Sequence, residues 1–213
     1  MSIVVEHEKR RHEILEKAMD VFMDEGFEDV TLQKIADRCG ITRTTLYTYF
    51  KNKREIFNFS IKQFLQILEN NLTEIKKEKN LSHTEKLIRV ITVIIERLEE
   101  NRRILSVVLD YLIYASKRDH NSGDYDPGYR VRRRTVRLRH ILATMLIEGI
   151  KAGEFSQSLN VKDANELLYG FLEAAVFRLV ILRRASVEEL KGAMKLAVRR
   201  FAAEKPSIKE SKT

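Results

Sequence analysis

The sequence contains little glycine and almost no proline, with 8 glycines and 2 prolines among 213 residues. Both prolines, Pro127 and Pro206, lie away from the middle of any apolar periodic stretch. Because short strands need frequent turns, this scarcity disfavours an all-β architecture and favours long helices. Hydrophobic residues make up 44% of the chain, enough to bury a core, and the length allows one large domain or two small ones.

Cysteine is nearly absent, because Cys39 is the only one in the chain. A single cysteine excludes an internal disulfide and indicates a reducing compartment. With five scattered histidines it offers no zinc-ligand spacing, so we expect neither a metal nor another cofactor. Residues 6–11 are charged where a signal peptide would be apolar, and no apolar run approaches the ~18 residues of a membrane span. We therefore expect a soluble cytoplasmic protein without a membrane partner.

Motifs for catalysis are also missing. The sequence has no phosphate-binding glycine loop, no Gly-x-Ser-x-Gly and no His-Glu-x-x-His. His7 and His12 are five positions apart, about 140° around a helix, so they do not converge on a metal. The acidic stretch 119–126 breaks the calcium-loop order, because Asp124 stands where that loop needs glycine. The sequence predicts no enzyme.

Positive charge exceeds negative charge, but its distribution is uneven. The formal net charge is +8, of which residues 1–60 carry −1 and residues 61–213 carry +9. Total charge alone therefore does not indicate nucleic-acid binding by the N-terminal segment. Within that segment the acidic residues come first, and a basic group follows at Arg43, Lys51, Lys53 and Arg54. One face of the segment can still be locally positive.

Hydrophobic periodicity predicts three helices near the N-terminus. The first covers residues 8–25 and ends at Gly26, where a left-handed cap is expected. Thr31 can cap a second, two-turn helix that ends at Gly40. Thr42 then caps a third helix. Two short helices on either side of a glycine-containing turn match the DNA-binding helix-turn-helix.

The third helix has two chemically different faces. Leu46 and Phe50 are four apart and are expected to face inward. Arg43 and Tyr47, also four apart, are expected to share an exposed face that can enter a groove. The first residues of a recognition helix contact base edges, which indicates base readout by Thr42, Arg43, Thr44 and Thr45. Arg43 can hold a guanine with two hydrogen bonds, worth roughly 1–3 kcal/mol of discrimination, and is the predicted specificity determinant.

Phosphate contacts come from exposed helix N-termini, hydroxyls and cations. These groups predict phosphate contacts at Thr31, Thr42 and Lys53. The alternative for the two threonines is a role as N-caps alone.

The stretch from Thr31 to Lys53 closely resembles the DNA-binding domain of TetR-type transcriptional regulators. The residues that carry the resemblance are Gly26-Phe27, Thr31, Ile35-Ala36, Gly40-Ile41, Thr45-Leu46-Tyr47, Tyr49-Phe50 and Asn52-Lys53. It implies an all-α protein of about nine helices, with a helix-turn-helix domain over 1–52 and a ligand-binding and dimerisation domain over 53–213. It also implies that Tyr47 and Tyr49 contact the DNA backbone, although both could be packing aromatics alone. Thr44 and Thr48 stand where many relatives carry glycine and histidine, which leaves the operator sequence open.

Six further helices are predicted after residue 52. A Ser-x-x-Glu capping box opens one at Ser82, and a second box pairs Ser186 with Glu189. A loop is expected over 117–128, and the expected helices cover about 53–79, 82–98, 101–117, 129–153, 162–184 and 187–203.

Residues 171–182 are apolar at ten of twelve positions, so this helix must be covered on two faces. One face can join the domain's own core, and the other can pack on a second copy of the chain. Residues of the next helix expected to share that contact are Leu190, Met194, Ala197 and Phe201. A four-helix homodimer interface through residues about 162–203 is what the resemblance implies. A helix buried inside a monomer remains the alternative.

Together with these features, the resemblance implies a homodimeric regulator, expected to be a repressor, that binds palindromic operator DNA and is released by a small-molecule effector. The alternative is a helix-turn-helix protein whose C-terminal domain binds a partner protein. Aromatic residues that could line an effector pocket or belong to the core are Phe64, Tyr111, Tyr114 and Phe171. Four arginines share one helical face, as a solvated surface or an anion-binding one: Arg130, Arg133, Arg134 and Arg137.

Overall fold

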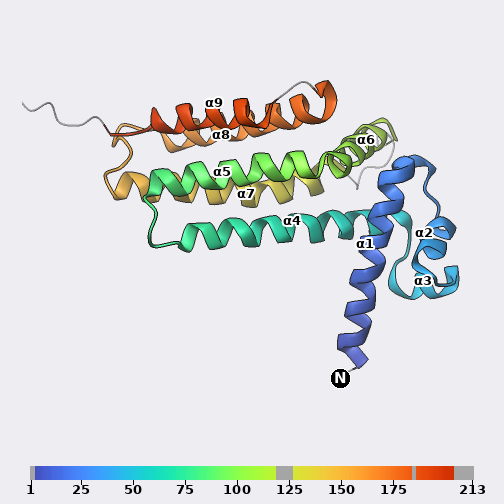
Figure 1. The fold of residues 1–213 in the computed structure, drawn as a ribbon. Helices are drawn as coiled ribbons and strands as arrows, with labels where there is room; N and C mark the ends of the chain where they lie inside the picture. Colours follow the sequence, from blue (N-terminus) through green and yellow to red (C-terminus); the bar gives the residue numbers. More distant parts are fainter. Residues whose placement is uncertain (1–2, 119–126, 184–185, 204–213) are drawn as a thin grey trace, which may run out of the picture. The chain divides into compact units, whose positions relative to one another are not determined.

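The structure is a computed structural model that describes residues 3–118, 127–183 and 186–203, with side chains over 5–114, 136–183 and 186–203. Every regular element in these ranges is helical (Figure 1): α1 (Ile3–Asp29), α2 (Leu32–Cys39), α3 (Arg43–Tyr49), α4 (Lys53–Lys77), α5 (His83–Glu100), α6 (Arg102–Arg118), α7 (Pro127–Lys151), α8 (Val161–Val176), the π-helical segment η2 (Phe177–Leu182) and α9 (Val187–Arg199). The expected all-α fold is confirmed, with nine α-helices in the described ranges. Most of the predicted loop over 117–128 lies outside the described residues.

The chain divides into two compact units. The first unit comprises residues 1–70 and 101–134, and the second comprises residues 71–100 and 135–213. This grouping differs from the expected division after Asn52. Ile56 and Phe57 of α4, with Tyr111 of α6, are buried in the same apolar core as helices α1 to α3. The first part of α4 and all of α6 therefore pack with the predicted DNA-binding helices.

An aromatic cluster forms the centre of the first unit. The ring of Phe27 lies 5.1 Å from that of Phe57 and 4.5 Å from that of Tyr111, measured between centroids. Phe22 meets Phe57 edge to face at 4.9 Å. Edge-to-face packing favours fixed ring orientations. Phe27 follows Gly26 directly, so this cluster holds the end of α1.

Both predicted ends of α2 are confirmed, whereas the predicted end of α1 at Gly26 differs in its backbone conformation. Thr31 Oγ1 accepts a hydrogen bond from the backbone N–H of Lys34 at 3.3 Å and caps α2. Gly40 ends α2 in the left-handed conformation, with φ 67° and ψ 35°. Gly26 also has a positive φ of 78°, but its ψ of 164° differs from the left-handed cap expected there. This glycine-specific conformation breaks α1 and starts the turn toward α2.

The second unit is organised around α5, which lies against α9 and α8 (Figure 1). The capping box at its start is confirmed: the Ser82 backbone N–H donates to Glu85 at 2.8 Å, and the Glu85 N–H donates to Ser82 Oγ at 3.1 Å. A third group, Glu154, accepts from the backbone N–H groups of His83 and Thr84 at 2.8 and 2.9 Å. The start of α5 is thus anchored to the segment after α7.

Two expectations about the last helices are corrected by the structure. Ser186 is the N-cap of α9, but its side chain makes no capping hydrogen bond. Leu190, Met194 and Phe201, expected to face a second copy, are 1%, 3% and 7% exposed within this chain. They are buried because α9 turns this face toward the core of its own unit. The outward apolar residue of α9 is Leu196, which is 61% exposed.

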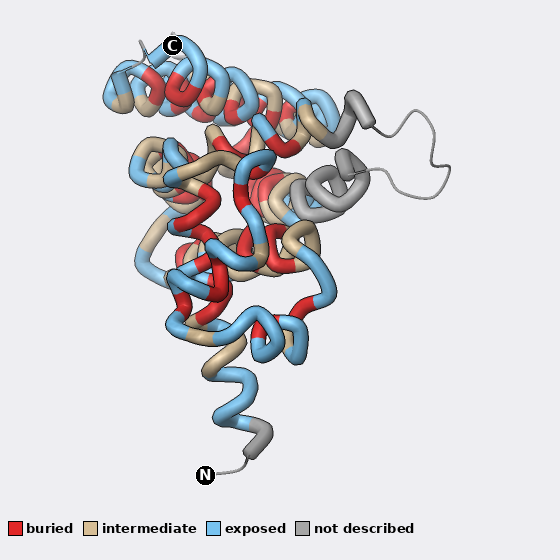
Figure 2. Tube along the Cα trace, turned by 90° about the vertical axis from the view of Figure 1, so that its right-hand side faces the viewer, coloured by how far each residue is buried: buried red, intermediate tan, exposed pale blue. Residues whose placement is uncertain are grey.

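Figure 2 shows buried positions recurring along the helices of each unit, whereas the first described turns of α1 are exposed. Buried residues spaced three and four apart are what one-sided helix packing requires. Among the described residues, every helix is too short or too polar to pass through a lipid bilayer.

Candidate nucleic-acid interface

Helices α2 and α3 are held from behind by apolar side chains. Ile35, Ala36 and Cys39 of α2 are buried, as is Leu46 of α3. Phe50, directly after α3, is 1% exposed, so the predicted inward direction of Leu46 and Phe50 is confirmed. Between the helices the Ile41 N–H donates to Ala36 O at 3.1 Å. The turn therefore presents α3 on a rigid support.

The outer face of α3 is open to solvent. Its exposed residues are Arg43, Thr44, Thr45, Tyr47 and Thr48. Arg43 Nη2 donates a hydrogen bond to Tyr47 Oη at 3.0 Å, and the Arg43 guanidinium carbon lies 5.5 Å from the Tyr47 ring centroid. One donor of the guanidinium is thereby used, and its other N–H groups can reach a base edge. A cationic helix with an uncovered face fits the width of a DNA major groove.

The threonines of α3 differ in what their hydroxyls do. Thr42 Oγ1 accepts from the backbone N–H of Thr45 at 3.1 Å and lies 2.9 Å from Thr45 Oγ1. Thr48 Oγ1 donates to Thr45 O at 2.7 Å. Thr44 is exposed, and its hydroxyl makes no hydrogen bond to any described residue. Of these four threonines, Thr44 therefore has the hydroxyl that is most available for a hydrogen bond to DNA.

The two tyrosines occupy different environments. Tyr47 is 47% exposed and points away from the core. Tyr49 is half-buried, and its ring stacks on His7 of α1 with centroids 4.5 Å apart and planes at 21°. This stack could not be predicted from sequence spacing, because His7 and Tyr49 are on separate helices. The first turns of α1 therefore lie beside the end of α3.

The structure gives Lys53 a role that the sequence did not suggest. Its ammonium donates to the carbonyl oxygens of Phe27, Glu28 and Val30 at 2.9, 2.7 and 2.8 Å. A lysine ammonium has three N–H donors, and all three are used here. The expected phosphate contact by Lys53 therefore conflicts with this arrangement. Sequence spacing could not reveal it, since the acceptors lie 23 to 26 positions away.

Lys51 is not among the residues predicted from the sequence to contact phosphate, but it is a second cation next to α3. It is exposed in the turn between α3 and α4. Its backbone N–H donates to Glu55 at 2.6 Å, while Asn52 caps α4 by accepting from the Glu55 N–H at 2.9 Å. The side chain of Lys51 is thus held near the end of α3 without being used in the cap.

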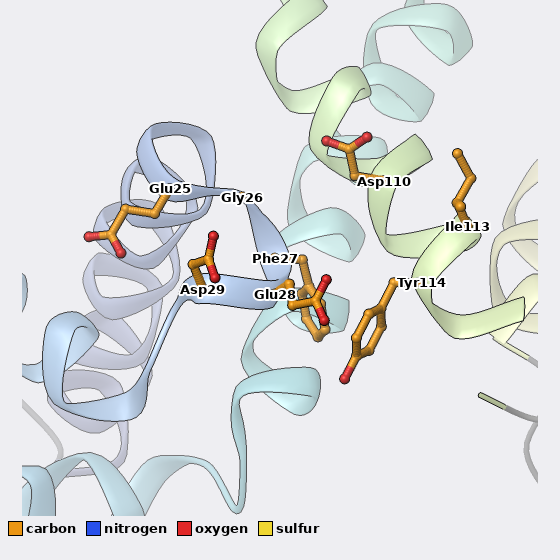
Figure 3. A pocket seen from close by; sticks show the side chains of 8 residues that line it. All are labelled: Glu25, Gly26, Phe27, Glu28, Asp29, Asp110, Ile113 and Tyr114. Atoms are coloured by element: carbon orange, nitrogen blue, oxygen red, sulfur yellow. The ribbon is translucent and has the colours of Figure 1, made fainter. Parts of the chain in front are cut away.

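Negatively charged side chains are concentrated on another part of the first unit. A hollow of about 510 Å³ between the C-terminal end of α1 and helix α6 is shown in Figure 3. Its lining residues are Glu25, Gly26, Phe27, Glu28, Asp29, Asp110, Ile113 and Tyr114. Four carboxylates there repel phosphate, so this hollow is not part of a nucleic-acid surface.

Other predicted positions are accounted for as follows. Tyr111 is buried in the aromatic cluster, and Tyr114 lines the acidic hollow, whereas Phe64 and Phe171 are half-buried in different units. The side chains of Arg130, Arg133 and Arg134 lie outside the described residues, and Arg137 is exposed. The described residues contain no group of His, Cys, Asp or Glu side chains able to hold a metal. Burial raises the pKa of the Cys39 thiol, so it is not a reactive thiolate.

Residues 14–58, which span the helix-turn-helix just described, match the family of bacterial regulatory proteins called the tetR family. The chain belongs to the TetR family of transcriptional regulators. It binds DNA and is a regulator rather than an enzyme. As a TetR-family protein it carries its DNA-binding helices at the N-terminus and further helices after them.

Relatives of this TetR-family chain include a regulator of fatty acid metabolism and a transcriptional repressor. It is 27% identical to the fatty acid metabolism regulator protein of Bacillus subtilis over 77% of this chain and 80% of that protein. It is 28% identical to the transcriptional repressor KstR2 of Mycolicibacterium smegmatis over 76% of this chain and 74% of that one. The structure of FadR from Bacillus subtilis, in complex with stearoyl-CoA, matches with a TM-score of 0.69 at 21% identity over 88% of this chain and 96% of that one. This likeness supports the same fold.

Proposed function

We propose that the protein is a ligand-responsive repressor that binds palindromic operator DNA as a homodimer, with α3 in the major groove. The observation that carries this proposal is the uncovered face of α3 with its Arg43–Tyr47 pair. A helix braced by buried residues on one side and open on the other can enter DNA without rearranging. A regulator with this activity must reach DNA, so we place it in the cytoplasm.

Each predicted contact of α3 is assigned a role. Arg43 reads a guanine, and Thr44 and Thr45 contact neighbouring base edges or thymine methyl groups. Thr42 stands at the N-terminus of α3 and Thr31 at that of α2, where helix ends favour phosphate. Both threonines already cap their helices, so they offer phosphate mainly the backbone N–H groups beside them.

The backbone contacts are completed by the two tyrosines and a lysine. Tyr47 and Tyr49 bind phosphate through their hydroxyls, and the exposed Lys51 supplies the cation beside them. Lys53 is not included, because its donors are held by the carbonyls of the α1–α2 turn.

The homodimer is proposed to form through the exposed apolar residues of α8, η2 and α9. Exposed fractions are 56% for Leu167, 53% for Phe177, 51% for Ile181, 47% for Leu182 and 61% for Leu196. Isolated exposed apolar residues are ordinary, but several on two successive helices favour an interface. The same helices bury their other faces in the second unit, which supports the prediction that residues 171–182 are covered twice. A two-fold dimer would read half-sites roughly 34–36 Å apart.

The effector is proposed to be a long-chain acyl-CoA thioester. Support comes from the relatives, since FadR of Bacillus subtilis was crystallised with stearoyl-CoA and the similar curated protein is a fatty acid metabolism regulator. The charge of residues 61–213, which is +9, suits a ligand with several phosphates. Binding would release DNA only if the ligand prefers a spacing of the two α3 helices that the operator does not fit.

The test uses the full-length protein and a pool of randomised duplexes. Selection is expected to enrich a palindrome with half-sites one helical turn apart, and stearoyl-CoA is expected to release the selected duplex in fluorescence anisotropy. Coenzyme A and stearate serve as controls, because the first has only the nucleotide part of stearoyl-CoA and the second only its acyl chain. Transcription from a promoter that overlaps the duplex should fall when the protein is added. Enrichment of no duplex would contradict the DNA-reading proposal, and release by none of the three compounds would favour a partner protein as the C-terminal ligand.

A further inference from the structure

We infer that Lys53 is a positioning residue of the DNA-binding surface, which sets the orientation of α3 without contacting DNA. The inference rests on the proposed function, because it takes the outer face of α3 as the surface that reads DNA. It adds a residue whose contribution comes through the protein backbone. The contacts that carry it all lie within the first unit.

The ammonium of Lys53 closes the turn between α1 and α2. The carbonyls of Phe27, Glu28 and Val30 converge on Nζ at 2.9, 2.7 and 2.8 Å. Carbonyls at the end of a helix lack partners within the helix and carry partial negative charge. A tetrahedral ammonium with three donors satisfies three such oxygens at once. Its Nζ also lies 4.9 Å from the centroid of the Phe27 ring.

The position of Lys53 in the chain makes this contact mechanically important. Lys53 is the first residue of α4, and α3 ends four residues earlier at Tyr49. Val30, one of its acceptors, stands two residues before the start of α2. A single side chain therefore joins the segment that enters α2 to the segment that leaves α3. The helix pair between them is fixed at both of its ends.

Three further contacts connect α1 with α2 and α6. Asp24 of α1 accepts hydrogen bonds from Arg38 of α2 at 3.0 Å and from Arg103 of α6 at 2.9 Å. Those two arginines, Arg38 first, lower the pKa of the Asp24 carboxyl. Phe27 packs on Tyr111 of α6. The turn between α1 and α2 is therefore held by contacts to both α4 and α6, and the hydrogen bonds of the Lys53 ammonium are its polar contacts to α4.

A phosphate contact and a positioning role predict different binding data. A lysine on phosphate weakens all duplexes alike and lowers the salt slope, whereas a positioning residue weakens the duplex that needs exact placement of α3. The ratio of affinities for the selected duplex and a scrambled duplex of equal length separates the two. A role in folding alone would lower the unfolding temperature and leave this ratio unchanged below that temperature.

The experiment compares Lys53→Met, Lys53→Arg and the control Lys51→Met, which removes the same charge from an exposed neighbour. We expect Lys53→Met to lower the affinity ratio about tenfold, while its salt slope changes less than that of Lys51→Met. Lys53→Arg keeps the charge, but its planar guanidinium does not match three converging carbonyls, so the ratio should also fall. This second variant decides the matter even if Lys53→Met does not fold.

Three results would overturn the inference. The first is a fall in salt slope for Lys53→Met as large as that of Lys51→Met, with the ratio unchanged. The second is full binding by Lys53→Arg, and the third is a lowered unfolding temperature with an unchanged ratio. If the wild-type protein selects no duplex, the proposed function fails instead, so the two failures are distinguishable.

Discussion

Arg43 and Tyr47 form a pair on the outer face of α3, in which the guanidinium donates to the phenol oxygen at 3.0 Å and lies 5.5 Å from the ring centroid. The pair restrains a long side chain before DNA arrives, which reduces the entropy lost on binding. It also directs one edge of the guanidinium toward Tyr47 and leaves the other edge for a base.

The first prediction concerns this restraint. Tyr47→Phe keeps the ring under Arg43 and removes the oxygen that accepts its hydrogen bond. Affinity for the selected duplex should fall by about 0.5–1.5 kcal/mol, through loss of that hydrogen bond and of any phosphate contact by the hydroxyl. Anisotropy titration measures the change. Tyr114→Phe is the matched control, because it removes the same oxygen from a tyrosine that lines the acidic hollow, away from the outer face of α3. An unchanged affinity for Tyr47→Phe would show that the pair does not contribute.

A second prediction concerns the homodimer. Leu196→Asp and Phe177→Asp each place a charge on an exposed apolar position of the proposed interface. Burying an unpaired carboxylate is costly, so both variants should sediment as monomers in analytical ultracentrifugation while the wild type sediments as a dimer. Ile113→Asp is the matched control, since Ile113 is 54% exposed on α6. Dimers of both interface variants, or a monomeric wild type, would refute the assigned interface.

A third prediction follows from the pKa of Glu154. Burial alone would raise that pKa, but hydrogen bonds from the backbone N–H groups of Thr84 and His83 and from the Thr84 hydroxyl outweigh it and hold the pKa below its ordinary value of 4.5. A carboxyl with a lowered folded pKa stabilises the fold above its unfolded pKa, and that stability is lost as the pH falls through the folded pKa.

Glu154→Gln should therefore lower the free energy of unfolding by about 0.5–2 kcal/mol at pH 7, as loss of a helix cap does. The gap between wild type and variant should shrink as the pH falls below about 4.5, because the wild-type carboxyl then becomes neutral as well. Urea titrations at fixed protein concentration measure it. Glu6→Gln, on the exposed first turns of α1, should show little difference at any pH. A gap for Glu154→Gln that is constant with pH would contradict the capping role.

A fourth prediction concerns the close approach of Gly149 and Phe155 in the second unit. A Cβ added at Gly149 would overlap the ring of Phe155, which is fully buried. Gly149→Ala should therefore destabilise the protein by about 1–3 kcal/mol, although alanine is the better helix former. The cost should be smaller in a Phe155→Leu background, whose side chain is shorter, so a double-mutant cycle measures the coupling. Equal costs in both backgrounds would show that the two residues do not conflict.

Local features of the sequence were sufficient for the helix-turn-helix. Thr31, Gly40 and Thr42 act on backbone groups within five residues, so their roles as caps could be predicted from spacing. The inward direction of Leu46 follows from helical periodicity in the same way. For these residues the sequence neighbourhood contains the interaction partner.

Features that depend on distant parts of the chain could not be predicted. The hydrogen bonds of Lys53 are one example. Its acceptors, the carbonyls of Phe27, Glu28 and Val30, come close to it only in the folded chain, so the sequence predicts a phosphate contact instead. The direction of Leu196 and Leu190 on α9 depends on which face meets α5, and a helix with apolar residues on several faces does not specify that. The π-helical segment η2 was also missed, because its wider turn changes the spacing of apolar residues.

The central claim is that the outer face of α3 reads DNA bases through Arg43. The most direct measurement titrates wild type and Arg43→Ala against the selected duplex and against single-base variants at every position of one half-site. The account predicts that the variant loses about 1–3 kcal/mol of discrimination at one guanine and keeps the preferences of the wild type elsewhere. Identical base preferences of wild type and Arg43→Ala at every position would contradict it.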